Sequence, residues 1–328
     1  MRLSDLTIKA VDYPLRVNWA ISRNQSTQKR VFYFKLGDLV LSFGAIKTLR
    51  ENYPNSNIYL LTQSNYKQIF KNLPYVNEIL VDNRISIFPS VKNILKKVKE
   101  KKIDLLIDLQ NSTRTEIYNL FIKIFTKCKI LSARKFSDYK YKQKKLGVQH
   151  ITKNHQEQLK YLEINNYLKP DLSWMLKGNT KQSKKVIFIP GTSKSGEYKK
   201  WPSDKYAQVA KYLVGRNYEV YLTGSDLDLD TINEIIKLCP ESKNKINESK
   251  IEDFYQLCNS SELVITNDTG PAHIAGLTNK NVIWLANDNE ISRSCYPLGS
   301  NLHKITASNV KNISVNTIIR SEEHTSEL

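Results

Sequence analysis

The stretch Leu263-Val-Ile-Thr-Asn-Asp-Thr-Gly-Pro-Ala-His273 joins a short apolar run to the start of a helix through a polar turn. Leu263–Thr266 has the length and the β-branched residues of a buried strand. Pro271 suits the first turn of a helix, because the N–H that proline lacks would have no partner there. We expect this helix to cover Ala272–Leu277. A buried strand followed at once by a helix is the repeating unit of a parallel α/β sheet.

The same unit recurs through the carboxyl-terminal half of the chain. Short apolar runs, typical of buried strands, alternate with segments of helical periodicity. The other expected strands are Val186–Ile189, Glu219–Leu222 and Val282–Leu285. The other expected helices are Ser203–Gly215, Asp230–Leu238 and Ile251–Asn259.

The amino-terminal half repeats the alternation, which predicts a second parallel sheet with helices on both faces. The expected strands are Val31–Phe34, Ile58–Leu61, Glu78–Val81, Ile103–Leu109 and Lys129–Ser132. The expected helices are 39–51, Asn65–Asn72, Val91–Lys101, Thr113–Phe125 and His155–Tyr167. Residues 134–149 break the rhythm, since they have no apolar face.

Two α/β halves of similar size predict two domains with a ligand cleft between them, where the carboxyl ends of both sets of strands converge. We expect one domain over residues 30–168 and the other over 186–320, joined by a linker at 169–185. Residues 1–29 are interpreted as an amino-terminal extension. Residues 321–328 turn abruptly acidic and polar, so we expect a non-native or frayed tail there.

The composition adds a large positive charge to an otherwise ordinary globular chain. The 328 residues include 50 Lys and Arg against 32 Asp and Glu, a formal net charge of +18. Such an excess indicates an anionic partner, namely nucleic acid, an acidic membrane surface or a phosphorylated substrate. No run approaches the roughly 20 apolar residues of a membrane-spanning helix, and no signal peptide is evident. We therefore expect a cytoplasmic protein.

The cysteines form no pattern typical of a zinc site or a disulfide framework. They are scattered at Cys128, Cys239, Cys258 and Cys295. We expect reduced thiols and no metal site.

Asp38 is the first candidate for chemistry. It follows Gly37 in Lys35-Leu-Gly-Asp38, at the turn between an expected strand and helix. A carboxylate at the carboxyl end of a strand faces the cleft of an α/β protein and can act as a general base. The alternative is an N-cap for the helix 39–51.

Two loops have the features of phosphate sites. Pro190-Gly-Thr-Ser193 through Lys199-Lys-Trp-Pro202 combines small hydroxyl residues with lysines and lacks the P-loop pattern. Its alternative is a solvated basic loop. In Asn267–His273, Gly270 permits close backbone approach, Thr269 supplies a hydroxyl, and Asp268 and His273 flank the turn. Its alternative is a capped turn with His273 packed on the sheet.

A third loop, Gly224-Ser-Asp-Leu-Asp-Leu-Asp230, contains a D-x-D pattern that occurs where a metal holds a nucleotide sugar. Here the pattern follows a strand and precedes a helix, so helix capping and a ribose contact fit better than a metal.

Taken together, these motifs resemble glycosyltransferase family 9, the bacterial heptosyltransferase family, over about residues 30–290. The resemblance is carried, in family order, by Lys35–Asp38, Ile103–Gln110, Pro190–Ser193, Lys199–Pro202, Leu222–Gly224 and Asn267–His273. It implies the GT-B architecture, in which two Rossmann-like parallel-sheet domains face each other across a cleft. The usual activity is inverting, metal-independent transfer to the lipopolysaccharide core from a nucleotide sugar, with ADP-heptose as the expected donor and no cofactor.

The resemblance also implies roles for individual residues. The family's catalytic aspartate falls on Asp38, and its donor-phosphate lysine, two residues before Trp-Pro, falls on Lys199. The donor-binding positions fall on Thr192, Ser193, Gly224, Asp268, Thr269, Gly270 and His273. Asp226 and Asp228 compete for an acidic nucleoside contact, and we expect Asp228.

A basic segment supplies the expected site for a phosphorylated glycolipid acceptor or for the anionic inner face of the cytoplasmic membrane. Its lysines, interleaved with aromatic residues, are Lys135, Lys140, Lys142, Lys144 and Lys145. Its alternative is a solvated basic face. The charge would also suit a nucleic-acid-binding protein, but no motif of that class is present and we expect no nucleic acid partner. A sugar-nucleotide epimerase of the same architecture is the other alternative.

Overall fold

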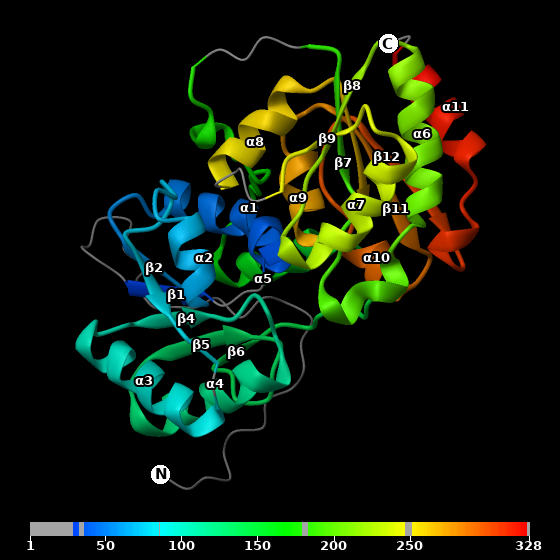
Figure 1. Cartoon of the computed structure of the whole chain (residues 1–328). Coiled ribbons are helices and arrows are strands. Elements are labelled where there is room, and N and C mark those ends of the chain that lie inside the picture. The colour runs from blue at the N-terminus through cyan, green and yellow to red at the C-terminus, as the bar shows by residue number, and fades with distance from the viewer. Residues whose placement is uncertain (1–28, 33–35, 85, 179–182, 247–250, 327–328) are drawn as a thin grey trace, which may run out of the picture.

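The computed structural model describes residues 29–32, 36–84, 86–178, 183–246 and 251–326. It contains two parallel six-stranded sheets, one in each half of the chain, with helices packed around them (Figure 1). The extension at 1–28, parts of the expected first strand and of the linker, and the last two residues lie outside the described residues.

The first sheet has the strand order β3-β2-β1-β4-β5-β6. Its strands are β1 (Lys29–Phe32), β2 (Asn57–Thr62), β3 (Glu78–Val81), β4 (Leu105–Ile107), β5 (Lys129–Ser132) and β6 (Tyr139–Lys140). Its helices are α1 (Leu36–Asn52), α2 (Ser64–Ile69), α3 (Ile87–Glu100), α4 (Thr113–Phe125) and α5 (Ile151–Leu159).

The second sheet has the order β12-β11-β10-β7-β8-β9. Its strands are β7 (Lys185–Ile189), β8 (Glu219–Leu222), β9 (Lys243–Asn244), β10 (Leu263–Asn267), β11 (Asn281–Asn287) and β12 (Leu302–Ala307). Its helices are α6 (Ser203–Gly215), α7 (Leu229–Leu238), α8 (Ile251–Ser260), α9 (Gly270–Gly276), α10 (Glu290–Ser294) and α11 (Val315–Ser326).

The strand order locates the crevice in each sheet. In the first sheet β1 lies between β2 and β4, and in the second β7 lies between β8 and β10. Connections leave such a central strand in opposite directions, which opens a crevice at the carboxyl ends of the strands. The turn into α1 follows β1, and the turn into α9 follows β10. Both candidate turns therefore lie at crevices.

The two halves share one apolar core. Leu39 and Phe43 of α1 belong to the same buried cluster as Ile274 of α9 and Ile189 of β7. Helix α1 packs against both α5 and α9. Gly44 lets α1 lie close to the chain after α5, because a Cβ atom there would lie 2.6 Å from the carbonyl oxygen of Leu168. Apolar packing of α1 against the carboxyl-terminal half therefore holds the two sides of the cleft together.

The structure departs from the sequence expectations at several boundaries. Helix α1 begins at Leu36, so Asp38 lies inside its first turn and the N-cap alternative is wrong. The segment 134–149, which has no apolar face, contributes β6, an edge strand that pairs with β5. The prediction of a frayed tail at 321–328 is wrong for residues 321–326, which continue α11. The helix continues because one that has already started upstream propagates at little cost. Glu322 is buried in this part of α11.

Among the described residues, no helix is long and apolar enough to cross a membrane.

Candidate functional site

Asp38 and the Asn267–His273 turn come from different halves of the chain and meet at the cleft. The side chain of Asp38 is exposed, in the first turn of α1. A Cβ atom at the preceding Gly37 would lie 3.0 Å from Cδ2 of His273, so a larger residue would be tight against the imidazole. His273 is buried against α1. The alternative of a histidine packed only on its own sheet is therefore incomplete.

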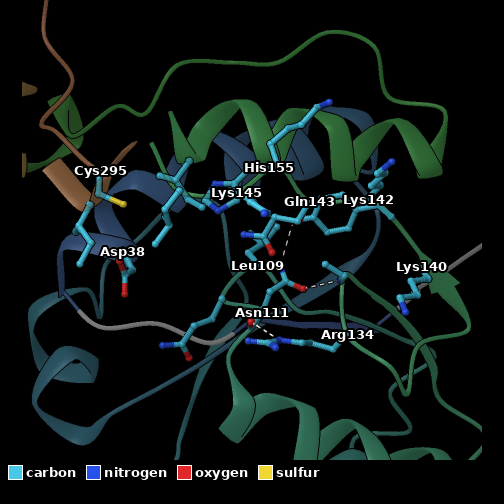
Figure 2. Close-up of a pocket in the computed structure, with 17 residues that line it drawn as sticks. Asp38, Leu109, Asn111, Arg134, Lys140, Lys142, Gln143, Lys145, His155 and Cys295 are labelled. Carbon is cyan, nitrogen blue, oxygen red and sulfur yellow. Dashed lines mark hydrogen bonds between the residues drawn. The ribbon is translucent and has the colours of Figure 1, made fainter. Parts of the chain in front are cut away.

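A cavity of about 1010 Å³ lies beside Asp38 and is lined by both halves of the chain. Ile291 and Cys295 form the contribution of the carboxyl-terminal half. Figure 2 shows Asp38 and Cys295 at one end of the cavity and Lys140 at the other. Five basic side chains line it, namely Arg134, Lys140, Lys142, Lys144 and Lys145. The cavity therefore combines one exposed carboxylate with a strongly cationic wall.

Four of the five lysines expected to form a surface patch thus line the cavity beside Asp38. Lys135 is the exception, since it is not among the lining residues and its backbone N–H donates to Glu116 at 3.3 Å. The segment turns inward because β6 pairs with β5 and delivers Lys140 and its successors to the carboxyl edge of the sheet.

Asp108 holds the floor of this cavity in place. It is fully buried, and its Oδ1 accepts hydrogen bonds from the backbone N–H groups of Gln110 (3.1 Å) and Asn111 (2.9 Å). Asn111 has a left-handed backbone with φ of 50°, and its side-chain oxygen accepts from the N–H of Ala133 at 2.7 Å. Burial raises the pKa of Asp108, against the hydrogen bonds that favour its ionised form. Its role is to shape the loop that carries Gln110 and Asn111 into the cavity wall.

Lys199 and Asp268 form a close ion pair. Lys199 Nζ donates to Asp268 Oδ2 at 2.6 Å, and both side chains are half-buried. The neighbouring Lys200 points elsewhere, because its Nζ lies 2.8 Å from Glu197 Oε1. The two neighbouring lysines therefore have different ion-pair partners, and the phosphate role expected for Lys199 stays a prediction.

The thiol of Cys295 reports the electrostatic field of this region. Its pKa is raised to about 12, mainly by burial and then by the negative charges of Asp38 and Asp268, while Lys199 opposes the shift. One half-buried sulfur thus senses all three charged candidates. Sequence reasoning had no role for Cys295, since its place in the cleft depends on how the two halves pack.

His273 is a neutral group at this site. Burial lowers its pKa to about 4, although the nearby carboxylate of Asp268 opposes the shift. Its Nδ1 has no hydrogen-bond partner among the described residues. A neutral imidazole can pack against Gly37 and can offer or accept one hydrogen bond, but it carries no positive charge near pH 7.

Five of the nine expected donor-binding residues line a separate pocket of about 300 Å³ in the carboxyl-terminal half, namely Thr192, Ser193, Gly224, Asp228 and Thr269. Asp268, Gly270, His273 and Lys199 are not among its lining residues. Of these, Asp268 pairs with Lys199, and His273 lies against Gly37.

Of the two competing aspartates, Asp228 lines this pocket and Asp226 does not. Asp228 Oδ2 accepts from both the backbone N–H and the hydroxyl of Ser225 at 2.9 Å, which confirms the capping interpretation. Its Oδ1 is buried and has no partner in the described part of the chain. Gly191 makes room for it, because a Cβ atom there would lie 2.1 Å from Asp228 Cγ.

The described residues include no group of three or more His, Cys, Asp or Glu side chains arranged to hold a metal ion.

Several lining residues were not anticipated from the sequence. Arg134 and Asn111 lie in two different loops and His155 lies in α5, and they reach the Asp38 cavity only after the sheet is assembled. Asp108 had one signal, since it belongs to the Ile103–Gln110 motif and directly follows the buried strand β4.

Comparison with known proteins places this geometry in a family. The profile of Glycosyltransferase family 9 (heptosyltransferase) matches residues 91–311. Lipopolysaccharide heptosyltransferase 2 of Salmonella typhimurium is 22% identical, over 76% of this chain and 79% of its own length.

Two solved structures have the same fold. A glycosyltransferase family 9 protein from Veillonella parvula matches with a TM-score of 0.74 and 17% identity, over 92% of this chain and 97% of its own. The Escherichia coli heptosyltransferase WaaC with ADP matches with a TM-score of 0.73 and 14% identity, over 91% and 100% of the two chains. The fold is thus GT-B, as expected from the sequence, and the family match covers the second sheet together with β4, β5 and β6 of the first. The chain belongs to glycosyltransferase family 9 and is a glycosyltransferase.

Proposed function

We propose that the enzyme transfers heptose from a nucleotide sugar, with ADP-heptose as the donor, to a sugar of the lipopolysaccharide core. The names of its relatives supply the sugar and the acceptor class. The observation that carries the proposal is the contact between Gly37 and His273, which brings Asp38 beside the turn that contains Asp268. A carboxylate and a phosphate-binding loop on opposite walls of one cleft suit transfer between two substrates.

Asp38 is the proposed general base. The acceptor hydroxyl becomes a better nucleophile if a carboxylate removes its proton as the new bond forms, a contribution of roughly 10²–10⁴-fold. A single displacement inverts the anomeric centre and requires no second carboxylate as nucleophile. The exposure of Asp38 at the end of the large cavity supports this role.

Lys199 is the proposed partner of the leaving diphosphate. Negative charge grows on the diphosphate in the transition state, and a fixed cation stabilises that charge. The ion pair with Asp268 supports the role, because it holds Lys199 Nζ beside the turn. Thr192, Ser193, Gly224, Thr269 and Gly270 are proposed to contact the rest of the donor, and Asp228 its ribose. The partnerless Oδ1 of Asp228 supports the ribose contact, since it can accept a sugar hydroxyl.

A phosphorylated core sugar is the proposed acceptor. Four lysines and Arg134 line the cavity that Asp38 enters, which supports an anionic acceptor held against the base. A metal is not part of the proposed mechanism.

The test is Asp38→Asn, assayed with ADP-heptose and a truncated lipopolysaccharide in excess EDTA. We expect kcat to fall roughly 10²–10⁴-fold, because the amide cannot take the proton. The thermal shift produced by ADP should persist, since a bound ligand still stabilises the fold. Undiminished transfer by the variant would remove Asp38 from the mechanism, and full loss of wild-type activity in EDTA would contradict the metal-free proposal.

The epimerase alternative predicts a changed sugar nucleotide without acceptor. Product analysis in the absence of lipopolysaccharide distinguishes it from transfer. A panel of ADP-, UDP-, GDP- and dTDP-sugars in a thermal-shift assay tests the donor, because the best-bound nucleotide raises the melting temperature most.

A further inference from the structure

We infer that His150 is a positioning residue that binds the basic segment 140–150 to the α10 region. It thereby fixes the position of the two walls of the Asp38 cavity relative to each other. The inference rests on the proposed function, because it assigns the acceptor side of that same cavity. It uses contacts that the proposed chemistry does not.

His150 uses both ring nitrogens, one to cap α5 in its own half and the other to reach the carboxyl-terminal half of the chain. Its Nδ1 accepts a hydrogen bond from the backbone N–H of Thr152 at 3.3 Å, as the N-cap of α5. Since that N–H can only donate, Nδ1 carries no proton and Nε2 must carry it. Nε2 lies 3.0 Å from the carbonyl oxygen of Tyr296, to which it therefore donates. The neutral tautomer is thus set by its two backbone partners.

The ring adds a packing contact to this hydrogen bond. The centroids of the His150 and Tyr296 rings are 4.4 Å apart. Lys304 Nζ lies 3.9 Å from the centroid of the Tyr296 ring. His150 of the amino-terminal half therefore meets Tyr296 and Lys304 of the carboxyl-terminal half around the Tyr296 ring.

A second contact lies beside the first. The backbone N–H of Gly147 donates to Ser294 Oγ at 2.7 Å. Gly147 has a φ of +83°, and a Cβ atom there would lie 3.2 Å from Glu290 Cγ. Both the left-handed backbone and the close approach favour glycine at this position.

The part of the segment that carries Lys144 is also hydrogen-bonded to α5. Asn154 is buried, and its Oδ1 accepts from the backbone N–H of Lys144 at 3.2 Å, while its Nδ2 donates to the Lys144 carbonyl at 3.4 Å. The backbone of Lys144 is thereby fixed to the helix whose N-cap is His150.

These contacts bracket the residues that the carboxyl-terminal half places in the cavity. The docked positions are Glu290, Ser294 and Tyr296, and the lining positions between them are Ile291 and Cys295. A displacement of α10 would therefore move this wall relative to Asp38. A misplacement of about 1 Å can cost on the order of 100-fold in rate.

The experiment compares His150→Asn with His150→Ala. Asparagine is a strong N-cap and can still accept from Thr152, but it is too short to donate to Tyr296. We expect His150→Asn to keep the wild-type melting temperature and ADP binding, while kcat/KM for the acceptor falls roughly 10- to 100-fold. His150→Ala should show the same kinetic loss together with a lower melting temperature.

A readout independent of activity is alkylation of Cys295 in the native protein. Loosening α10 should expose this thiol, so iodoacetamide should label it faster in His150→Asn than in wild type. His150→Asn/Cys295→Ser assigns the label. Wild-type acceptor kinetics and labelling in His150→Asn would overturn the inference, as would parallel losses of ADP binding and melting temperature. If Cys295 is labelled faster in His150→Asn while the separate variant Asp38→Asn is fully active, the inference about His150 stands and the proposed general base is rejected.

Discussion

At the scale of single residues, Cys295 lies among three charged side chains of the site. Burial raises its pKa most, the negative charges of Asp38 and Asp268 raise it further, and the positive charge of Lys199 lowers it. Because the pKa is about 12, only about 10⁻⁴ of this thiol is ionised at pH 8, and thiolate is the reactive form. The thiol can therefore serve as a probe of its neighbours.

We predict that the pH at which Cys295 becomes alkylated moves in opposite directions in two variants. Asp38→Asn removes a negative charge, so the pKa falls and labelling at a given pH becomes faster. Lys199→Met removes the opposing positive charge, so the pKa rises and labelling becomes slower. The measurement is the rate of iodoacetamide labelling against pH, with Cys295→Ser as the blank. Shifts of the same sign in both variants would mean that exposure, rather than charge, controls the thiol.

At this scale the Trp-Pro spacing predicted a donor-phosphate role for Lys199 and not for Lys200, and that role stays a prediction. In the structure Lys199 pairs with Asp268 and Lys200 with Glu197. Cys295, Arg134 and His150 were missed because each is brought to the cleft by contacts between distant segments. No local pattern encodes such contacts.

At the scale of elements, the loop after β4 is shaped by a buried carboxyl group. Asp108 has a raised pKa because of burial, so the folded state binds its proton more tightly than the unfolded state does. Stability therefore falls as pH rises through the unfolded pKa toward the folded pKa. An asparagine at this position can accept the same two backbone hydrogen bonds without the charge.

We predict that Asp108→Asn unfolds at equal or higher urea than wild type near pH 7, and that its advantage shrinks as the pH is lowered toward 4. Asp108→Ala should lose about 1–3 kcal/mol, since it leaves the N–H groups of Gln110 and Asn111 without their acceptor. Urea unfolding at several pH values measures both. An advantage for Asp108→Asn that does not change with pH would rule out the buried charge as its cause.

The boundaries of α4 and α6 both match the expectation. Ser112 and Thr115 form a capping box at the start of α4, whereas α6 has no side-chain cap. Strand β12 was missed because its residues are only partly buried and do not form an apolar run. Strand β6 was missed because an edge position requires contact on one side only.

At the scale of the whole molecule, the two parallel sheets could be predicted because the alternation of strands and helices repeats along the chain. The packing of the halves could not, since it depends on the shared core beneath α1 and α9. Four of the lysines expected at an acceptor or membrane site line the cavity, while Lys96 and Lys99 of α3 are outside it.

We therefore predict that the two groups of lysines affect different measurements. Lys144→Gln/Lys145→Gln should raise the acceptor KM, because these side chains line the Asp38 cavity. Lys96→Gln/Lys99→Gln should weaken binding to vesicles of anionic lipid by about 1 kcal/mol per residue, because both lysines are exposed on α3, outside the cavity. Salt should weaken vesicle binding of the wild type steeply, since surface charges are screened over about 8 Å at physiological ionic strength. Sedimentation with vesicles and acceptor kinetics measure the two effects on the same four-protein set, namely the wild type, each double variant and their combination. If the cavity variant alone abolishes vesicle binding, then the acceptor cavity is itself the membrane contact, and the separation of the two surfaces is wrong.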